Sequence, residues 1–265
     1  MALFGFPLLN AELAIGRGSG LGISRALGEL APAASRGFWG TVGRLLFAGN
    51  ILLLMYYTDV AGWLLRYVGI YASGGVSGDL SAAYDAVVGG RVGCSLCIAA
   101  VVGISAIVCS LGVVKGVERT AKWMMISLLL LLSILAVRSL AMPGAMKGVR
   151  FYLDPDWGRF LANPLRSISE AASQAFFTIS VGVGAMTALG SYTGRAHSLT
   201  SSALWIIVID TTVALLSGLI VFPACSACGI DVTSGPGLIF VALPGVFRIM
   251  EGGAVWGTAF FAFVF

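Results

Sequence analysis

The stretch Ser173–Tyr192 reads SQAFFTISVGVGAMTALGSY and is long and apolar enough to cross a bilayer, yet two glycines stand in its middle. Gly182 and Gly184 are preceded by Ser180 and followed by Thr187. A glycine costs about 1 kcal/mol relative to alanine inside a helix, so this pair predicts a helix that unwinds in mid-membrane. Unwound backbone leaves amides and carbonyls free to bind charged groups. Close helix packing through small residues explains the glycines equally well at this point.

The composition of the whole chain is that of a helical membrane protein. Of its 265 residues, 58% are hydrophobic and 11% are charged, whereas soluble domains have about 25% charged residues. The mean hydropathy is +0.96, and 36 glycines occur without a collagen-like period. The net charge of +4 is scattered through short loops and forms no basic face, which argues against a nucleic-acid partner. We therefore expect an all-α, polytopic membrane protein in contact with lipid.

Charged residues divide the chain into seven apolar segments. A helix needs about 20 residues to cross a bilayer. Five segments are long enough to span a bilayer and two are short: Met1–Ile15, Leu45–Tyr71, Val92–Val114, Trp123–Leu140, Ala171–Tyr192, Ser198–Ile230 and a segment that begins near Gly252. The first is too short to cross alone, and the last reaches the final residue, Phe265, in mid-helix. We expect residues 1–265 to form a single transmembrane domain that is truncated at both ends.

The connections between these segments carry their own signals. The basic residues from Arg17 to Arg44 favour a cytoplasmic location for that connection. Ser24–Ala34 is a candidate interfacial helix. The long segment Pro143–Glu170 contains Asp-Pro-Asp and Asn-Pro breakers, which predict an ordered external loop with short helices.

Four ionisable residues fall inside the apolar segments, and such residues are costly in a membrane and commonly functional. Asp210 lies near the middle of the sixth segment, where it is either an ion ligand or a protonated packing group. Glu12 is expected to be structural, bonding to the amides of a broken helix. Asp59 and Arg66 stand seven residues apart and are expected to form a partly exposed pair at a water-filled entrance.

The cysteines allow a different hypothesis. Cys94 and Cys97 form one CxxC pair, and Cys225 and Cys228 form another. Four thiolates can bind zinc, and such pairs also occur in thiol oxidoreductases. Because no basic or histidine-rich sequence accompanies them, we favour the role of small buried apolar residues. His197, the single histidine, is expected to be solvated in a short loop.

Six blocks in order resemble the bacterial branch of the neurotransmitter:sodium symporter family along nearly the whole chain. These blocks are GFPLLNAELAIGR (5–17), YYTDVAGW (56–63), GVVKGVERTAKWMM (112–125), FYLDPDW (151–157), SQAFFTISVGVGAMTALGSY (173–192) and GPGLIFVALPGVF (235–247). The resemblance implies a partial LeuT-type inverted-repeat transporter fold, from helix two to the start of helix eight. It further implies sodium-coupled symport of a small amino acid.

The same resemblance implies which residues bind the substrate. Tyr57 matches the tyrosine whose hydroxyl meets the substrate carboxylate, and Leu53 lies one turn before it. Phe177 matches an aromatic lid over the substrate, while Ser180 and Val183 match residues that line the pocket beside the unwound stretch.

The resemblance also implies how sodium is bound. Thr178 and Asp210 match ligands of the first sodium ion, although the family often has asparagine at the position of Asp210. An acid there implies a fixed negative charge that replaces chloride. Glu12, Gly182 and Gly184 match structural residues of the broken helices. Helix one of the family supplies much of the substrate site and of the sodium sites, and it would precede Met1. We therefore expect no transport by residues 1–265 alone.

Sodium-coupled symport across a plasma (inner) membrane is therefore the function predicted for the full transporter, with sodium, an amino acid and lipid as partners and without covalent chemistry. Two alternatives stay open: a non-transporting truncated remnant, and a membrane thiol oxidoreductase that uses the CxxC pairs. The sequence is also compatible with a homo-oligomer. The identity of the amino acid does not follow from the sequence.

Overall fold

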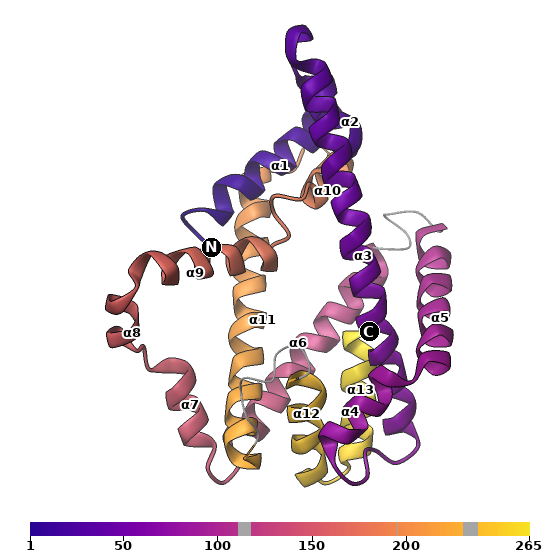
Figure 1. Ribbon diagram of the computed structural model, residues 1–265, viewed down its shortest axis with the longest axis vertical. Coiled ribbons are helices and arrows are strands. Elements are labelled where there is room, and N and C mark those ends of the chain that lie inside the picture. Colours follow the sequence, from indigo (N-terminus) through magenta and orange to yellow (C-terminus); the bar gives the residue numbers. More distant parts are fainter. Residues whose placement is uncertain (111–117, 195, 230–237) are drawn as a thin grey trace. The chain divides into compact units, whose positions relative to one another are not determined.

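The computed structural model describes residues 1–110, 118–194, 196–229 and 238–265, and every regular element in these ranges is a helix (Figure 1). The first helices along the chain are α1 (Gly5–Ser19), α2 (Ile23–Leu30), the 3-10 turn η1 (Ala33–Ser35), α3 (Arg36–Ala72), α4 (Leu80–Gly89), α5 (Arg91–Ser110), α6 (Arg119–Leu140), α7 (Ala145–Leu153) and α8 (Trp157–Ala162). The remaining helices are α9 (Pro164–Thr178), α10 (Ala185–Tyr192), α11 (Leu199–Cys228), α12 (Leu238–Ile249) and α13 (Gly253–Val264). The predicted all-α class is confirmed.

Four of these helices are long and apolar enough to cross a membrane, and each overlaps a predicted span, although the first begins before the predicted start at Leu45. They cover Ala33–Ala72, Val92–Ser110, Arg119–Leu140 and Leu199–Ala227. The predicted ends of two spans, residues 111–114 and residue 230, lie outside the described residues. Helix α1 has 15 residues and is about 22 Å long, short of the roughly 30 Å hydrocarbon core, in line with the sequence-based expectation.

The connections contain more helix than the sequence pattern predicts. The short helices α7 and α8 occur in the segment Pro143–Glu170 as expected, and its last seven residues belong to α9. Helices α4 and α12 were not anticipated. Asp79 begins α4, because its carboxylate accepts hydrogen bonds from the backbone N–H groups of Ser81 and Ala82. Helix α12 continues through Pro244, a residue that normally argues for a helix end.

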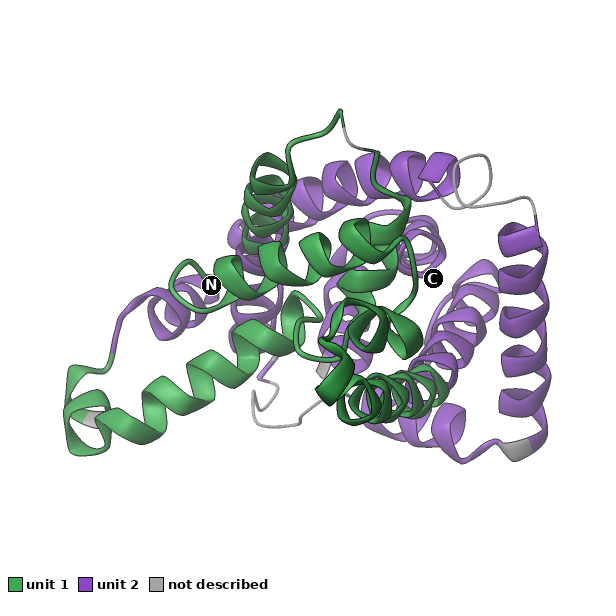
Figure 2. Ribbon diagram, turned by 90° about the horizontal axis from the view of Figure 1, so that it is seen from above, with its two compact units in different colours: residues 1–55, 156–212 green, residues 56–155, 213–265 purple. Residues whose placement is uncertain are grey.

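The chain divides into two compact units, which are coloured separately in Figure 2. Unit 1 contains residues 1–55 and 156–212. Its core is apolar and consists of Leu9, Leu13, Ile179, Val181, Leu199, Ala203 and Ile207. Helices α1 and α10 approach closely in this unit, since a Cβ atom at Gly16 would collide with the carbonyl of Thr187 and one at Gly190 with the backbone of Leu13. Small residues thus let these two backbones touch, as is common between membrane helices.

Unit 2 contains residues 56–155 and 213–265, and aromatic rings fill its core. The hydroxyl of Tyr67 donates a hydrogen bond to the carbonyl of Phe240 at 3.1 Å. The ring of Phe240 stacks on Phe261 with a centroid separation of 6.1 Å and an interplanar angle of 8°. Ser139, fully buried on α6, donates to the carbonyl of Ile220 on α11 at 2.7 Å. These bonds give buried hydroxyls partners on neighbouring helices.

The prediction that Arg66 pairs with Asp59 is wrong. The Arg66 guanidinium donates to the carbonyl of Val87 at 2.8 Å, near the C-terminus of α4, and within the described ranges it makes no ion pair with Asp59. Seven residues along a helix separate Asp59 from Arg66 by about 10 Å. The nearby carbonyl end of α4 therefore attracts the cation more strongly, because helix C-termini carry partial negative charge.

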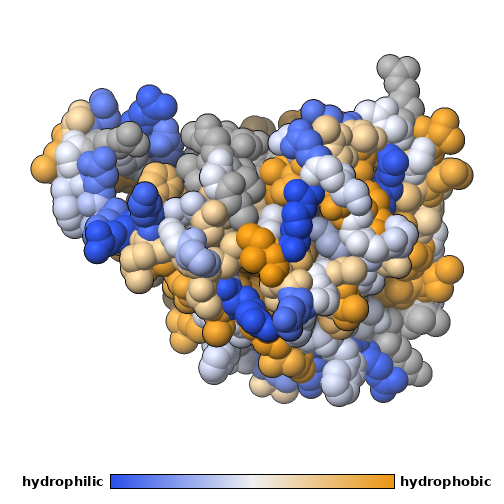
Figure 3. Space-filling model, turned by 90° about the horizontal axis from the view of Figure 1, so that it is seen from below, coloured by the Kyte–Doolittle hydropathy of each residue, from blue (hydrophilic) through white to orange (hydrophobic). Residues whose placement is uncertain are grey.

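Large apolar side chains are exposed on both units, and orange patches mark such residues in Figure 3. Four examples, each more than 60% exposed, are Leu52, Trp123, Leu130 and Val137. All four lie on helices long enough to cross a membrane. A surface of this kind is stable when lipid covers it, which agrees with a multi-pass membrane protein.

Candidate functional site in the broken helix of unit 1

The predicted break is present, and it interrupts the helix between Thr178, the last residue of α9, and Ala185, the first residue of α10. Three residues of the intervening segment have left-handed backbone conformations: Ser180 with a φ of 53°, Gly182 with 93° and Gly184 with 80°. Side chains disfavour this region, which explains two glycines in the break. Among the described non-glycine residues only Ser180 has a positive φ. The backbone is therefore unwound at the position that the sequence predicted.

Glu12 of α1 contacts the unwound segment. Its Oε1 atom accepts a hydrogen bond from the backbone N–H of Gly182, with 2.6 Å between the two atoms. Its other carboxylate oxygen is buried and has no hydrogen-bond partner among the described residues. The carboxylate also stands at the N-terminal end of α10, where unpaired N–H groups favour a negative charge. This geometry is what the structural role predicted for Glu12 requires.

A second polar contact to the break comes from Asn50 of α3, which sequence reasoning missed. Its Nδ2 atom lies 2.6 Å from the carbonyl oxygen of Val183 and 2.9 Å from that of Leu46. The available signal was an uncharged amide in an otherwise apolar stretch, LLFAGNILLL. A neutral amide carries no charge that would mark it as costly in a membrane, so the sequence alone does not distinguish it from a packing residue.

The two predicted sodium ligands both lie in unit 1. The Thr178 hydroxyl donates to the carbonyl of Gln174, one turn earlier on α9, at 2.7 Å. The Thr178 oxygen in turn accepts a hydrogen bond from Nε2 of Gln174 at 3.4 Å, which leaves one of its two lone pairs for a further contact. Asp210, on α11, is half-buried, and its Oδ2 atom is buried without a partner among the described residues. A buried carboxylate oxygen without a hydrogen-bond donor costs free energy, and a bound cation would offset that cost.

Thr178 and Asp210 share no hydrogen bond in the described part of the chain. Sodium would have to bridge their oxygen atoms, and no group of three or more acidic, cysteine or histidine side chains occurs among the described residues. The roles of Thr178 and Asp210 as sodium ligands therefore remain predictions.

The predicted substrate-binding residues divide between the two units. Leu53, Phe177, Ser180 and Val183 lie in unit 1, whereas Tyr57 lies in the part of α3 that belongs to unit 2 and begins at Tyr56. Leu53, Ser180 and Val183 are partly buried, while the ring of Phe177 is 56% exposed. An exposed ring beside the break is available to cover a ligand. The roles of these five residues remain predictions.

Cys94 and Cys97 do not form a disulfide with each other. Cys94 is buried, and its thiol donates to the carbonyl of Val87 at 3.0 Å. Cys97 is partly exposed, and the side chain of Cys228 lies outside the described residues. Burial and a hydrogen bond to a carbonyl oxygen are typical of a structural cysteine.

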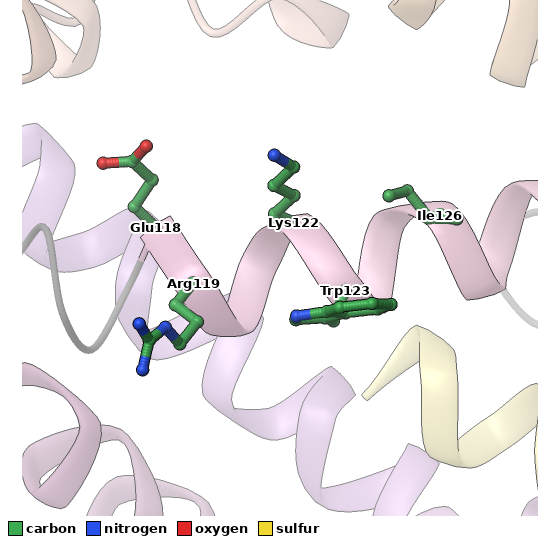
Figure 4. Close-up of a pocket in the computed structure, with 5 residues that line it drawn as sticks. All are labelled: Glu118, Arg119, Lys122, Trp123 and Ile126. Carbon is green, nitrogen blue, oxygen red and sulfur yellow. The ribbon is translucent and has the colours of Figure 1, made fainter.

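A hollow of about 450 Å³ is found beside the beginning of α6 (Figure 4). The described residues that line it are Glu118, which directly precedes α6, and Arg119, Lys122, Trp123 and Ile126 of that helix. In Figure 4, Glu118, Lys122 and Ile126 point to one side of the helix, and Arg119 and Trp123 point to the other. The described lining side chains therefore do not converge on a common point.

Comparison with known proteins places this geometry in a family. The sequence model of the Sodium:neurotransmitter symporter family matches residues 84–265. The sodium-dependent transporter YhdH of Bacillus subtilis is 35% identical over 268 residues, which cover 99% of this chain and 58% of YhdH. The chain belongs to the sodium:neurotransmitter symporter family. The family and the partial transporter fold predicted from the sequence are thereby confirmed.

Other members of the sodium:neurotransmitter symporter family agree with this result. The solved structure of MhsT in complex with L-phenylalanine matches with a TM-score of 0.90 and 34% identity, covering 99% of this chain and 59% of MhsT. The sodium- and chloride-dependent creatine transporter 1 of Bos taurus is 34% identical over 158 residues, which cover 56% of this chain and 25% of that protein. The chain thus spans less than two thirds of the length of these relatives.

Proposed function

We propose that this chain supplies the central helices of a sodium-coupled symporter for a small amino acid, located in a plasma (inner) membrane. The observation that carries the proposal is the break at residues 179–184, held by Glu12 in a unit that also contains Thr178 and Asp210. Discontinuous helices leave backbone groups free at mid-membrane, where transporters bind substrates and coupling ions. Membership of the sodium:neurotransmitter symporter family supports the same conclusion.

We infer the substrate class from the side chains beside the break and from the ligands that the relatives' names give. The exposed ring of Phe177 offers an apolar cover for a ligand beside the break. L-phenylalanine, bound in MhsT, and creatine, named for the Bos taurus relative, both combine a carboxylate with a cationic nitrogen. A zwitterionic amino acid meets these requirements, and Tyr57 would contribute its hydroxyl to the carboxylate.

Sodium is a transported substrate in this proposal and has no catalytic role. The Asp210 carboxylate would offset its charge, while the Thr178 hydroxyl oxygen and backbone carbonyls of the break would replace water molecules. Binding of the ion beside the break would favour the arrangement that holds the amino acid. No covalent step is required, so the protein is not proposed to be an enzyme.

Uptake into proteoliposomes tests the proposal directly. The chain would be extended with the flanking segments of YhdH that lie outside the aligned region, purified and reconstituted with an inward sodium gradient. Accumulation of a radiolabelled amino acid that disappears when potassium replaces sodium is the expected result. The absence of sodium-stimulated uptake or binding across a panel of all twenty amino acids would refute the proposal and favour a non-transporting protein.

A further inference from the structure

The two amide hydrogens of Asn50 bond to two carbonyl oxygens, one on its own helix and one in the unwound segment. One goes to Leu46, four residues earlier on α3, and the other goes to Val183 in the unwound segment. The donor–acceptor distances are 2.9 Å and 2.6 Å. The Asn50 amide has only two hydrogens to donate, so both are committed. The bond to Leu46 fixes the side-chain rotamer, and the bond to Val183 connects α3 to the break.

On α1, Glu12 holds the neighbouring residue of the break. It accepts from the N–H of Gly182 at 2.6 Å, whereas Asn50 donates to the C=O of Val183. Two side chains from two helices therefore hold consecutive residues of the unwound segment, one through a donor and one through an acceptor. All four residues lie within unit 1.

We infer that Asn50 is a positioning residue of the substrate site, which together with Glu12 fixes the conformation of residues 180–184. The inference rests on the proposed function, because it assigns Asn50 to the site of that transporter. Carbonyls of an unwound segment need a partner inside a membrane. Asn50 provides one for Val183 and thereby limits which carbonyls of the break remain free for a cation.

The constraint has a consequence for the neighbouring side chains. Ser180 is held at a φ of 53°, and Gly182 and Gly184 also have positive φ values. For a non-glycine residue such as Ser180 this conformation persists only where surrounding contacts determine it. Without the Asn50 bond, the backbone of the break can rotate toward more favourable values. The side chains of Ser180 and Val183 would then leave the positions in which they line the predicted pocket.

Amide hydrogen–deuterium exchange of the purified chain in detergent tests the contact itself. Asn50→Leu removes the donor at similar volume, and Asn50→Asp replaces the amide with an acceptor of the same shape. Both should accelerate exchange in peptides that cover residues 177–188, while Asn50→Gln, which keeps both hydrogens, should restore part of the protection. Thr41→Val is the matched control on the same helix, because Thr41 donates only within α3, to Gly37.

Kinetics of the YhdH-extended protein test the positioning role. Loss of one hydrogen bond should raise the KM for the amino acid by about two- to tenfold in Asn50→Leu, with kcat little changed. Thr41→Val should leave both constants unchanged. Unchanged exchange in both the Leu and Asp variants would overturn the contact, whatever the transport result.

The remaining outcomes separate this inference from the proposed function. Faster exchange with an unchanged KM would overturn the positioning role. Loss of protection over the whole chain in both variants would also overturn it, in favour of a general stabilising role. Absence of sodium-driven uptake in the unmutated extended protein, with exchange accelerated as expected, would refute the proposed function and leave the Asn50 contact established.

Discussion

Glu12 and Gly182 stand 170 positions apart in the sequence, yet Oε1 of the carboxylate lies 2.6 Å from the backbone nitrogen of the glycine. The bond joins a helix near the N-terminus to the break between α9 and α10. It pairs a negative charge with an N–H group that a continuous helix would have satisfied by itself. Charge-assisted bonds of this kind are among the stronger hydrogen bonds in proteins.

Replacement of Glu12 by alanine should therefore destabilise unit 1. The change leaves the Gly182 N–H without an acceptor, which costs about 1–3 kcal/mol. Thermal unfolding in detergent, followed by tryptophan fluorescence, should show a lower midpoint for Glu12→Ala. Glu29→Ala provides the control, since Glu29 is exposed on α2. Equal midpoints for the two variants would contradict the structural role of Glu12.

The two glycines of the break should respond differently to alanine. Both have positive φ values, a conformation that costs an L-residue about 1–2 kcal/mol. A Cβ atom at Gly184 would additionally collide with the side chain of Ile23, whereas one at Gly182 would meet nothing within 4 Å. Gly184→Ala should thus lower the unfolding midpoint more than Gly182→Ala does. The opposite order would show that the space beside Gly182 is filled in the folded protein.

The sequence was most informative where a physical requirement selects one kind of residue. The glycine pair predicted the break because few other residues accept φ values of 93° and 80° at Gly182 and Gly184. Hydropathy located the long helices because only an apolar surface is stable in lipid. The family blocks then identified a transporter fold, which the match to MhsT bears out.

The sequence was less informative where contacts between distant residues decide the outcome. Nothing near Arg66 indicated that its partner would be the carbonyl of Val87, because that contact depends on how α4 folds back toward α3. Asn50 was missed for the same reason, since its importance comes from a carbonyl 133 positions away. Spacing along one helix cannot reveal such partners, and only the folded backbone does.

Tyr57 is the predicted contact to the substrate carboxylate, and removal of its hydroxyl tests that role. Tyr57→Phe keeps the ring and removes one hydrogen bond to a charged group, which corresponds to about 1.5–3 kcal/mol. The affinity for the amino acid should fall by roughly tenfold to somewhat more than a hundredfold in equilibrium binding to the YhdH-extended protein. Tyr56→Phe, which changes the neighbouring exposed ring in the same way, is the matched control. Identical affinities for Tyr57→Phe and the unmutated protein would place the carboxylate elsewhere.

Asp210 is the predicted source of negative charge at the sodium site. Asp210→Ala removes a ligand and its charge together, so sodium-dependent binding of the amino acid should be lost in the extended protein. Folding should survive, because the change leaves a small apolar residue on α11 and removes a buried oxygen that has no partner among the described residues. Substrate binding as a function of sodium concentration provides the measurement. A sodium affinity equal to that of the unmutated protein would exclude Asp210 from the site.

The same charge leads to a prediction about chloride. An ionised Asp210 carries the negative charge that would otherwise come from an anion near sodium, so uptake should continue when gluconate replaces chloride. Asp210→Asn keeps the shape and an oxygen ligand but removes the charge, and it should create or strengthen a chloride requirement. Coulomb attraction between opposite charges about 4 Å apart reaches roughly 4 kcal/mol at an effective dielectric constant of about 20, enough for one missing charge to decide whether sodium binds. Uptake by both proteins would be compared in chloride and in gluconate. A strong chloride requirement in the unmutated protein would contradict the assignment, as would an Asp210→Asn variant that transports equally well in both salts.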